Sequence, residues 1–135
     1  MNKAMIFVLG LFLAAAAAPP SWAQPSGPAA AIAAFDTDKD GTLSWDEVRV
    51  AALAKFKAAD PDNDGTLDAK EAAKLGITKN MLKKADPDKD ATLDSDEYLK
   101  IVKQRFDAAD PDHDGTLSVK ELGSPQGRLL LQLIQ

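Results

Sequence analysis

Hydrophobic residues in this chain recur in short blocks at helical spacing, and polar stretches of constant length separate the blocks. Two apolar residues three positions apart precede each polar stretch, which places them on one face of a helix. We therefore expect an amphipathic helix to enter each stretch and to bury that face. The pairs are Ile32 and Phe35, Phe56 and Ala59, Leu82 and Ala85, and Phe106 and Ala109, and the polar stretches that follow them are residues 36–47, 60–71, 86–97 and 110–121.

The segments between the polar stretches predict how the chain folds back. Val48–Ala59 and Tyr98–Ala109 contain neither glycine nor proline. Each is expected to form a single helix, ~18 Å long, with a polar stretch at both ends. Between the second and third stretches, Gly76 can end one helix and Thr78 can cap another that starts near Lys79. The resulting hairpin brings the second stretch beside the third, and the first beside the fourth.

The fold class that follows is all-α, a compact bundle of small helices. In the C-terminal tail, Ser124-Pro125 is typical of a helix start, because proline is favoured at the first helical position. Residues 128–134 are strongly apolar. We expect this helix to cover the core, with a dimer or partner contact as the alternative.

The N-terminal 23 residues are typical of a secretory signal peptide. Lys3 supplies a positive start, Ala4–Ala18 is apolar, and Ser21-Trp22-Ala23 places small residues at a cleavage site. The apolar run is shorter than the ~20 residues that a membrane anchor needs. We expect cleavage after Ala23, export to the periplasm, a flexible segment over residues 24–31 and a folded domain over residues 32–135.

The four polar stretches align without a gap and form an internal repeat. Each has Asp at positions 1, 3 and 5, Thr at 7, Leu at 8, Ser or Asp at 9, and Glu at 12. This is the pattern of the EF-hand calcium loop. We name the copies loop 1 (36–47), loop 2 (60–71), loop 3 (86–97) and loop 4 (110–121).

The pattern reflects coordination by hard oxygen ligands. Positions 1, 3 and 5 supply carboxylates, position 7 its backbone carbonyl, position 9 a direct or water-mediated contact, and Glu at 12 two oxygens. Glycine at position 6 permits the left-handed turn, and Leu at 8 is expected to meet its counterpart in a paired loop. The predicted metal ligands are Asp36, Asp38, Asp40, Thr42, Ser44 and Glu47 in loop 1; Asp60, Asp62, Asp64, Thr66, Asp68 and Glu71 in loop 2; Asp86, Asp88, Asp90, Thr92, Asp94 and Glu97 in loop 3; and Asp110, Asp112, Asp114, Thr116, Ser118 and Glu121 in loop 4.

Composition supports a metal site over a generic acidic surface. Of the 21 acidic residues, all but Asp46, Asp96 and Asp107 occupy ligand positions. The net charge of −5 argues against nucleic acid as a partner and for cations. The chain has no cysteine, so disulfides and thiolate metal sites are excluded. Its single histidine, His113, is at a non-ligand position of loop 4, and we predict neither an enzyme nor an organic cofactor.

These residues resemble the lanmodulin family, which are periplasmic lanthanide-binding EF-hand proteins. Proline at position 2 in three loops, the short helices between loops and the tail at 121–135 carry the resemblance. It implies selective binding of trivalent lanthanides, a disorder-to-order transition on binding, and the loop pairing 2/3 with 1/4. The prolines are Pro61, Pro87 and Pro111.

The loops differ in ways that predict a ranking. Loops 2 and 3 have five carboxylates at ligand positions, whereas loops 1 and 4 have four because serine stands at position 9. Loop 1 has Thr37 instead of proline, and loop 3 has Ala91 instead of glycine at position 6. We therefore expect loop 2 to be the strongest site.

The function predicted from the sequence is lanthanide(III) binding at up to four sites with metal-induced folding, for uptake or handling of these ions. The alternative is a periplasmic calcium buffer or sensor, with Ca²⁺ as the ligand. We expect a monomer that binds metal ions and neither nucleic acid nor, after cleavage, a membrane, with a metal-dependent dimer as the alternative.

Overall fold

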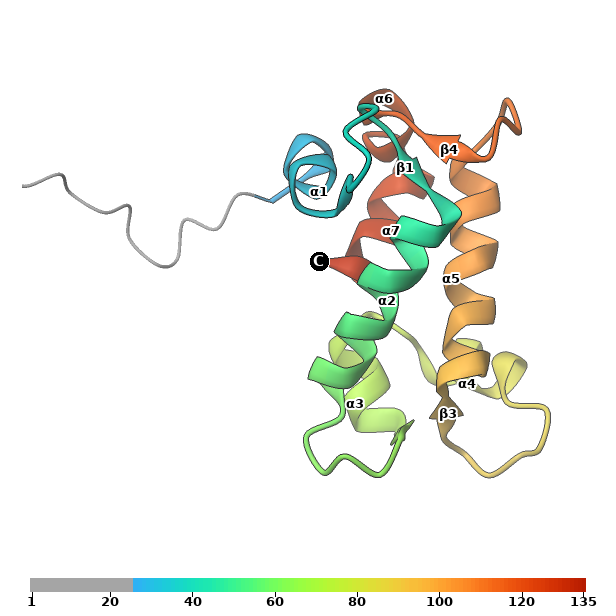
Figure 1. The fold of residues 1–135 in the computed structure, drawn as a ribbon. Coiled ribbons are helices and arrows are strands. Elements are labelled where there is room, and N and C mark those ends of the chain that lie inside the picture. Colours follow the sequence, from blue (N-terminus) through green and yellow to red (C-terminus); the bar gives the residue numbers. More distant parts are fainter. Residues whose placement is uncertain (1–25) are drawn as a thin grey trace, which may run out of the picture.

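A computed structural model describes residues 26–135, and within them the chain is mostly helical (Figure 1). The predicted signal peptide over residues 1–23 lies outside the described residues. The helices are α1 (Pro28–Phe35), α2 (Trp45–Ala59), α3 (Ala69–Lys74), α4 (Lys79–Ala85), α5 (Ser95–Ala109), α6 (Val119–Leu122) and α7 (Pro125–Ile134), and the two-residue strands are β1 (Leu43–Ser44), β2 (Thr66–Leu67), β3 (Leu93–Asp94) and β4 (Thr116–Leu117).

Helices α2 and α5 form the long axis of the molecule (Figure 1). Each is a single 15-residue helix with a loop at both ends, as the sequence predicted. Both helices start three residues earlier than expected. The reason is a capping box at each helix start. The side chain of Ser44 in α2, or of Asp94 in α5, accepts a hydrogen bond from the amide of the position-12 glutamate, and the glutamate side chain accepts one from the amide of the cap residue.

The loops pair as the spacing predicted. Strand β1 pairs antiparallel with β4, and β2 pairs antiparallel with β3. Position 8 of each loop contributes a leucine to its strand, and all four leucines are fully buried. Loops 1 and 4 therefore lie at one end of α2 and α5, and loops 2 and 3 lie at the other (Figure 1). The leucine partners are Leu43 with Leu117 and Leu67 with Leu93.

A tight turn between α3 and α4 makes the predicted hairpin. Gly76 adopts a φ of 75°, which ends the preceding helix. Thr78 then caps α4, and its hydroxyl accepts a hydrogen bond from the Met81 amide. Both residues have the roles that the sequence assigned to them.

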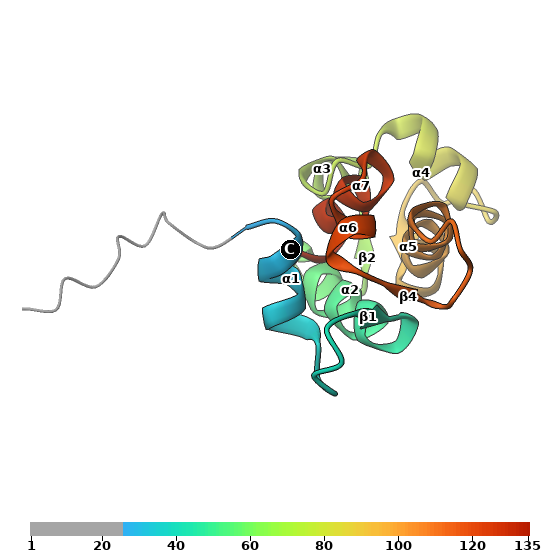
Figure 2. The same cartoon turned by 90° about the horizontal axis from the view of Figure 1, so that it is seen from above.

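The C-terminal helix α7 completes the core, as expected. It packs against α5 and α2, with Leu130, Leu131, Leu133 and Ile134 buried. Seen from above, α7 lies between α3 and α6 and beside α2 (Figure 2). Its N-cap is Ser124, whose hydroxyl accepts from the Gly127 amide.

The folded region begins earlier than the predicted boundary at residue 32. Helix α1 starts at Pro28, and Ala31 is completely buried. The side-chain amide of Gln135 also forms two hydrogen bonds with the backbone of Gly27. It donates to the Gly27 carbonyl at 3.2 Å and accepts from the Gly27 amide at 3.3 Å. Proline at the helix start and these tail contacts order the latter part of the segment that was expected to be flexible.

Helix α7 is also tied to α5 by a buried hydrogen bond. The hydroxyl of Tyr98, which is fully buried, donates to the carbonyl of Leu133 at 2.7 Å. Tyr98→Phe removes the donor and leaves that carbonyl unsatisfied, so we expect a loss of about 1–3 kcal/mol in the free energy of unfolding. Urea unfolding of the metal-loaded protein measures it. An unchanged midpoint would show that water or another donor replaces the hydroxyl.

Across residues 26–135, no helix is both long enough and apolar enough to cross a membrane.

Candidate metal centres

Each loop brings three carboxylates together. One oxygen atom from each carboxylate lies within 4.8 Å of the other two, a spacing at which one cation can contact all three. In loops 2, 3 and 4 the glutamate of position 12 joins the aspartates of positions 1 and 3, whereas in loop 1 the group is formed by three aspartates. The groups are Asp36, Asp38 and Asp40; Asp60, Asp62 and Glu71; Asp86, Asp88 and Glu97; and Asp110, Asp112 and Glu121.

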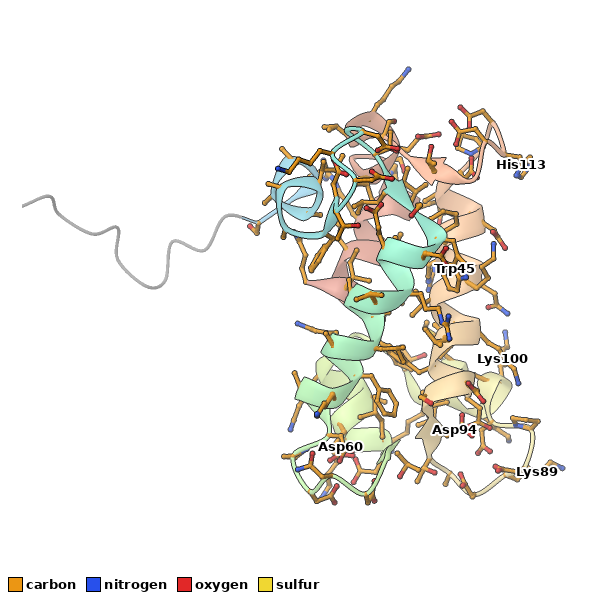
Figure 3. All side chains as sticks on the ribbon, in the orientation of Figure 1. Trp45, Asp60, Lys89, Asp94, Lys100 and His113 are labelled. Carbon is orange, nitrogen blue, oxygen red and sulfur yellow. The ribbon has the colours of Figure 1, made fainter. Side chains whose placement is uncertain are left out.

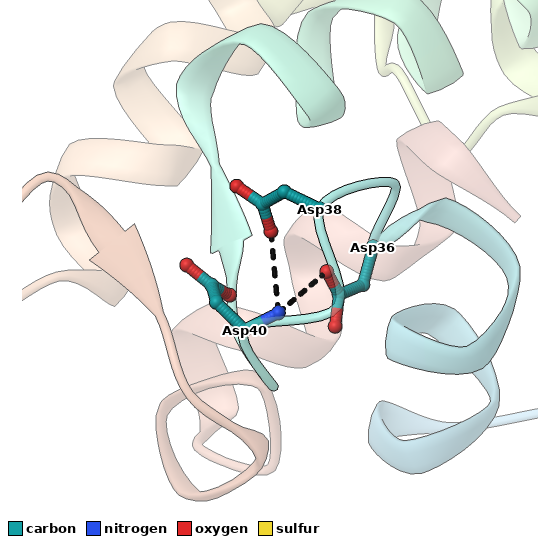
Figure 4. A group of neighbouring side chains, drawn as sticks. All are labelled: Asp36, Asp38 and Asp40. Atoms are coloured by element: carbon teal, nitrogen blue, oxygen red, sulfur yellow. Dashed lines mark hydrogen bonds between the residues drawn. The ribbon is translucent and has the colours of Figure 1, made fainter.

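The aspartate of position 1 organises each loop from its start. In loop 1, Asp36 accepts from the Asp40 amide at 3.2 Å and from the Gly41 amide at 2.9 Å. The Asp40 amide also reaches a carboxylate oxygen of Asp38 at 3.3 Å (Figure 4). These hydrogen bonds hold the backbone of the loop in a turn around the three carboxylates. The same contact with the amide of position 6 recurs in loops 2, 3 and 4.

Two residues in each loop adopt left-handed backbone. Position 6 was predicted to do so, and Gly41, Gly65 and Gly115 have φ of 81–85°. Position 4 is left-handed as well, which was not predicted from the sequence. Its residues in the four loops are Lys39, Asn63, Lys89 and His113, with φ of 54–60°. The asparagine at this position is a weak signal of the geometry, because asparagine tolerates it better than most residues do.

Position 5 and position 7 are linked in every loop. The Asp40 carboxylate accepts from both the amide and the hydroxyl of Thr42 at 2.8 Å. Equivalent pairs of hydrogen bonds join Asp64 to Thr66, Asp90 to Thr92 and Asp114 to Thr116. The threonine side chain therefore orients the position-5 carboxylate, a role beyond the carbonyl ligand predicted from the sequence.

Position 9 acts as a helix cap in the structure. The side chains of Ser44, Asp68, Asp94 and Ser118 accept from the amide of the position-12 glutamate, which in turn accepts from their own amides. The spacing Ser/Asp-x-x-Glu is a capping-box signal that was readable in the sequence. The cap fixes where Glu at 12 lies, so the same residue starts the helix and closes the metal site.

The carboxylates at positions 1 and 3 approach each other closely enough to perturb their pKa values. A side-chain hydrogen bond with Asp60 raises the pKa of Asp62, and a side-chain hydrogen bond with Asp86 likewise raises the pKa of Asp88. Burial raises the pKa of Asp60, but backbone donors such as the Gly65 amide outweigh it and the net shift is downward. A cation between the two carboxylates would replace the proton that this hydrogen bond requires, so metal and proton compete for the same place.

Loop 4 contains a direct indication that a cation fits. The Oδ1 atom of Asp110 is buried and has no hydrogen-bond partner among the described residues. An ionised oxygen in this situation is costly unless a positive charge compensates it. The oxygen-only donor set and the three convergent carboxylates have the chemistry that hard cations such as calcium require.

Glu47 in loop 1 lies in a different environment from the other closing glutamates. Burial raises its pKa, but hydrogen bonds from the amides and hydroxyls of Ser44 and Thr37 outweigh burial and lower the pKa to about 2. In loop 3, by contrast, burial dominates and raises the pKa of Glu97. Loop 1 therefore supplies donors from Thr37 and from the Ser44 hydroxyl, in addition to the position-9 amide that both loops share.

Trp45 and His113 lie outside the ligand sets. Trp45 is half-buried and packs edge-to-face on Phe106, with the Lys103 ammonium 5.3 Å from its ring centre. This contact joins the start of α2 to the end of α5 between loops 1 and 4 (Figure 3). His113 is exposed at the tip of loop 4 (Figure 3).

Loop 3 is strained at its sixth position, where Ala91 has a φ of 67°. Alanine in this region costs roughly 1–2 kcal/mol, and glycine recovers part of it at an entropic cost of roughly 0.5–1 kcal/mol. We expect Ala91→Gly to raise the metal affinity of loop 3 about fivefold. Isothermal titration against a competing chelator measures the change.

Loop 2 provides the matched control, because it has the same five carboxylates and Gly65 at a φ of 85°. Gly65→Ala should weaken loop 2 by a similar factor. Equal affinities before and after both exchanges would show that the backbone conformation of position 6 does not limit binding.

A family model described as EF hand matches residues 29–50, 53–71 and 101–124. These segments contain loops 1, 2 and 4, and the unmatched loop 3 is the copy that has Ala91 at position 6. A comparison with curated proteins finds no match. The three matches and the four acidic clusters fit an EF-hand metal-binding protein. EF-hand proteins are typically non-enzymatic metal binders.

Proposed function

We propose that this protein binds trivalent lanthanide ions in its four loops and folds around them. The observation that carries the proposal is the concentration of carboxylates at ligand positions, together with proline at position 2 in three of the four loops. The same features underlie its resemblance to the lanmodulin family.

The carboxylate count favours a trivalent ion on electrostatic grounds. Raising the ion's charge from two to three deepens each attraction to an anionic oxygen by about half in the Coulomb expression. The gain grows with the number of carboxylates, and loops 2 and 3 offer five each. Loop 2 combines five carboxylates with glycine at position 6 and proline at position 2, so we expect it to bind most tightly.

Proline at position 2 prepares the loop for the ion. It fixes its own φ and restricts the aspartate before it, which lowers the conformational entropy that ordering the loop would cost. It also removes one backbone donor close to the carboxylates. The lower entropic cost makes binding of the ion more favourable.

One titration tests the proposal. The metal-free protein is followed by circular dichroism while lanthanum or calcium is added on a chelator-buffered scale of free ion. We expect lanthanum to produce the folded spectrum at a free concentration lower by several orders of magnitude. If calcium acts at the same concentration, the protein is a calcium buffer or sensor instead.

We further propose that the protein is exported to the periplasm and handles these ions there. The support is the signal-peptide pattern over residues 1–23. Mass spectrometry of the protein from a periplasmic fraction should give an N-terminus at Gln24. An intact N-terminus on cytoplasmic protein would contradict the proposal.

A further inference from the structure

Loop 1 is the copy in which position 2 can donate hydrogen bonds. The amide of Thr37 donates to Oε1 of Glu47 at 2.6 Å, and the Thr37 hydroxyl donates to the same oxygen at 2.9 Å. The Asp38 amide approaches it at 3.4 Å. The other oxygen, Oε2, accepts from the amide and hydroxyl of Ser44 at 2.9 and 3.1 Å. Protein donors therefore engage both oxygens of the glutamate that should close the loop.

Proline prevents this arrangement in the other three loops, since it has no amide hydrogen and no hydroxyl. The closing glutamates there keep the contact between Oε2 and the amide of position 9. No donor from the first half of loop 2, 3 or 4 reaches Oε1 in residues 26–135. These glutamates join the aspartates of positions 1 and 3 in a three-carboxylate group, whereas Glu47 stands outside the group of loop 1.

We propose that Thr37 is a positioning residue that holds Glu47 away from the ion and makes loop 1 the last of the four to fill. This inference rests on metal binding by the loops, as proposed above. It compares the affinities of the different loops for the same ion. It therefore holds whether the preferred ion is a lanthanide or calcium.

The cost of releasing Glu47 sets the size of the effect. Two-oxygen coordination at position 12 requires Oε1 to exchange its Thr37 donors for the ion. Hydrogen bonds to a charged group are among the stronger ones in proteins, and the donors that Glu47 leaves must find water. We expect loop 1 to bind about ten- to a hundredfold more weakly than loop 4 for this reason.

Loop 4 is a close comparison, because its ligand set is the same. Both loops have aspartate at positions 1, 3 and 5, glycine at 6, threonine at 7, serine at 9 and glutamate at 12. They are also partners in one sheet, through β1 and β4. Position 2 is where their donor chemistry toward the closing glutamate differs, with Thr37 in one and Pro111 in the other.

The experiment exchanges these two residues and reads each loop separately. The amides of Gly41 and Gly115 donate to the first aspartate of their loops at 2.9 and 3.1 Å, so their NMR signals report occupancy loop by loop. Diamagnetic lanthanum, and separately calcium, is titrated into the full mature protein in a chelator buffer. Thr37→Pro and Pro111→Thr are compared with the wild type.

In the wild type, the Gly41 signal should change at a free-ion concentration about ten- to a hundredfold above that of Gly115. Thr37→Pro should close this gap, and Pro111→Thr should weaken loop 4 by capturing Glu121 in the same way. Because the second variant acts on the other loop, it keeps the test valid if the first fails to fold.

Two conservative variants separate hydrogen bonding from the stiffness of proline. Thr37→Ser keeps both donors and should behave as the wild type. Thr37→Val keeps the amide but loses the hydroxyl, so it should close part of the gap. The proposal is overturned if Thr37→Pro leaves loop 1 last to fill, or if Thr37→Val is indistinguishable from the wild type. If lanthanum does not bind but calcium shows the difference between loops 1 and 4, the result counts against the lanthanide function and not against the role of Thr37.

Discussion

Replacing Glu71 with glutamine is expected to remove tight metal binding from loop 2 and leave the other loops able to fill. Glu71 is buried beside Asp60 and Asp62, and it supplies the charged oxygens that close the site. Removing one partner from a buried charge cluster costs about 3–5 kcal/mol, which corresponds to roughly a hundredfold to several thousandfold in affinity. Competitive titration should show one fewer tight site.

The glutamine variant is informative because it preserves the cap of α3. In the wild type, the Asp68 amide donates to Oε2 of Glu71 at 2.9 Å, and the amide oxygen of glutamine can accept the same bond. Asp96→Asn serves as the control, since Asp96 is an exposed acid outside the ligand positions of loop 3. If Asp96→Asn weakened binding as much as Glu71→Gln, total charge rather than coordination would explain the affinity.

Replacing Gly127 with alanine is expected to prevent α7 from docking. A Cβ atom on Gly127 would lie 2.2 Å from the Glu121 carbonyl oxygen and 2.5 Å from the Leu122 Cα, so the backbone has to move. Such overpacking should lower the free energy of unfolding by about 3 kcal/mol or more. Because Glu121 closes loop 4, this loop should lose affinity more than loop 2 does.

Gly123→Ala is the matched control for this substitution. A Cβ there would meet the carbonyl oxygens of Val119 and Lys120 at 3.3 and 3.4 Å, which small shifts accommodate. We expect its free energy of unfolding to stay within about 1 kcal/mol of the wild type. Urea denaturation of both metal-loaded variants measures the difference, and equal stability of the two would refute the close approach of α7 to loop 4.

The arrangement of the loops was predictable because chain length decides it. A 12-residue segment without glycine or proline has room for a single helix, so the loops at its two ends cannot pair with each other. The pairing of loop 2 with loop 3 then followed from Gly76 and Thr78, both of which have their predicted roles. Regular elements with strong start and stop signals leave few alternatives.

Other features depend on three-dimensional contacts that the repeat pattern does not contain. The motif treats Glu47 as equivalent to Glu71, but its hydrogen bonds with Thr37 arise only when the loop closes on itself. Likewise, Gly27, which precedes α1, forms hydrogen bonds with Gln135, 108 residues away in sequence. Contacts between distant residues cannot be read from local spacing. The left-handed residues at position 4 were missed because lysine gives no sign of that conformation, and asparagine and histidine give only a weak one.

Helices α2 and α5 also determine how the four sites communicate. An isolated 15-residue helix is only marginally stable in water, because nucleating its first turn is costly. In the proposed metal-induced folding, an ion in either flanking loop would order one end of the helix, so an ion at the opposite end would no longer bear that nucleation cost. Loop 1 is thereby coupled to loop 2 through α2, and loop 3 to loop 4 through α5. The two small sheets couple loop 2 to loop 3 and loop 4 to loop 1. The couplings form a closed ring, in which every site reaches every other by two independent routes.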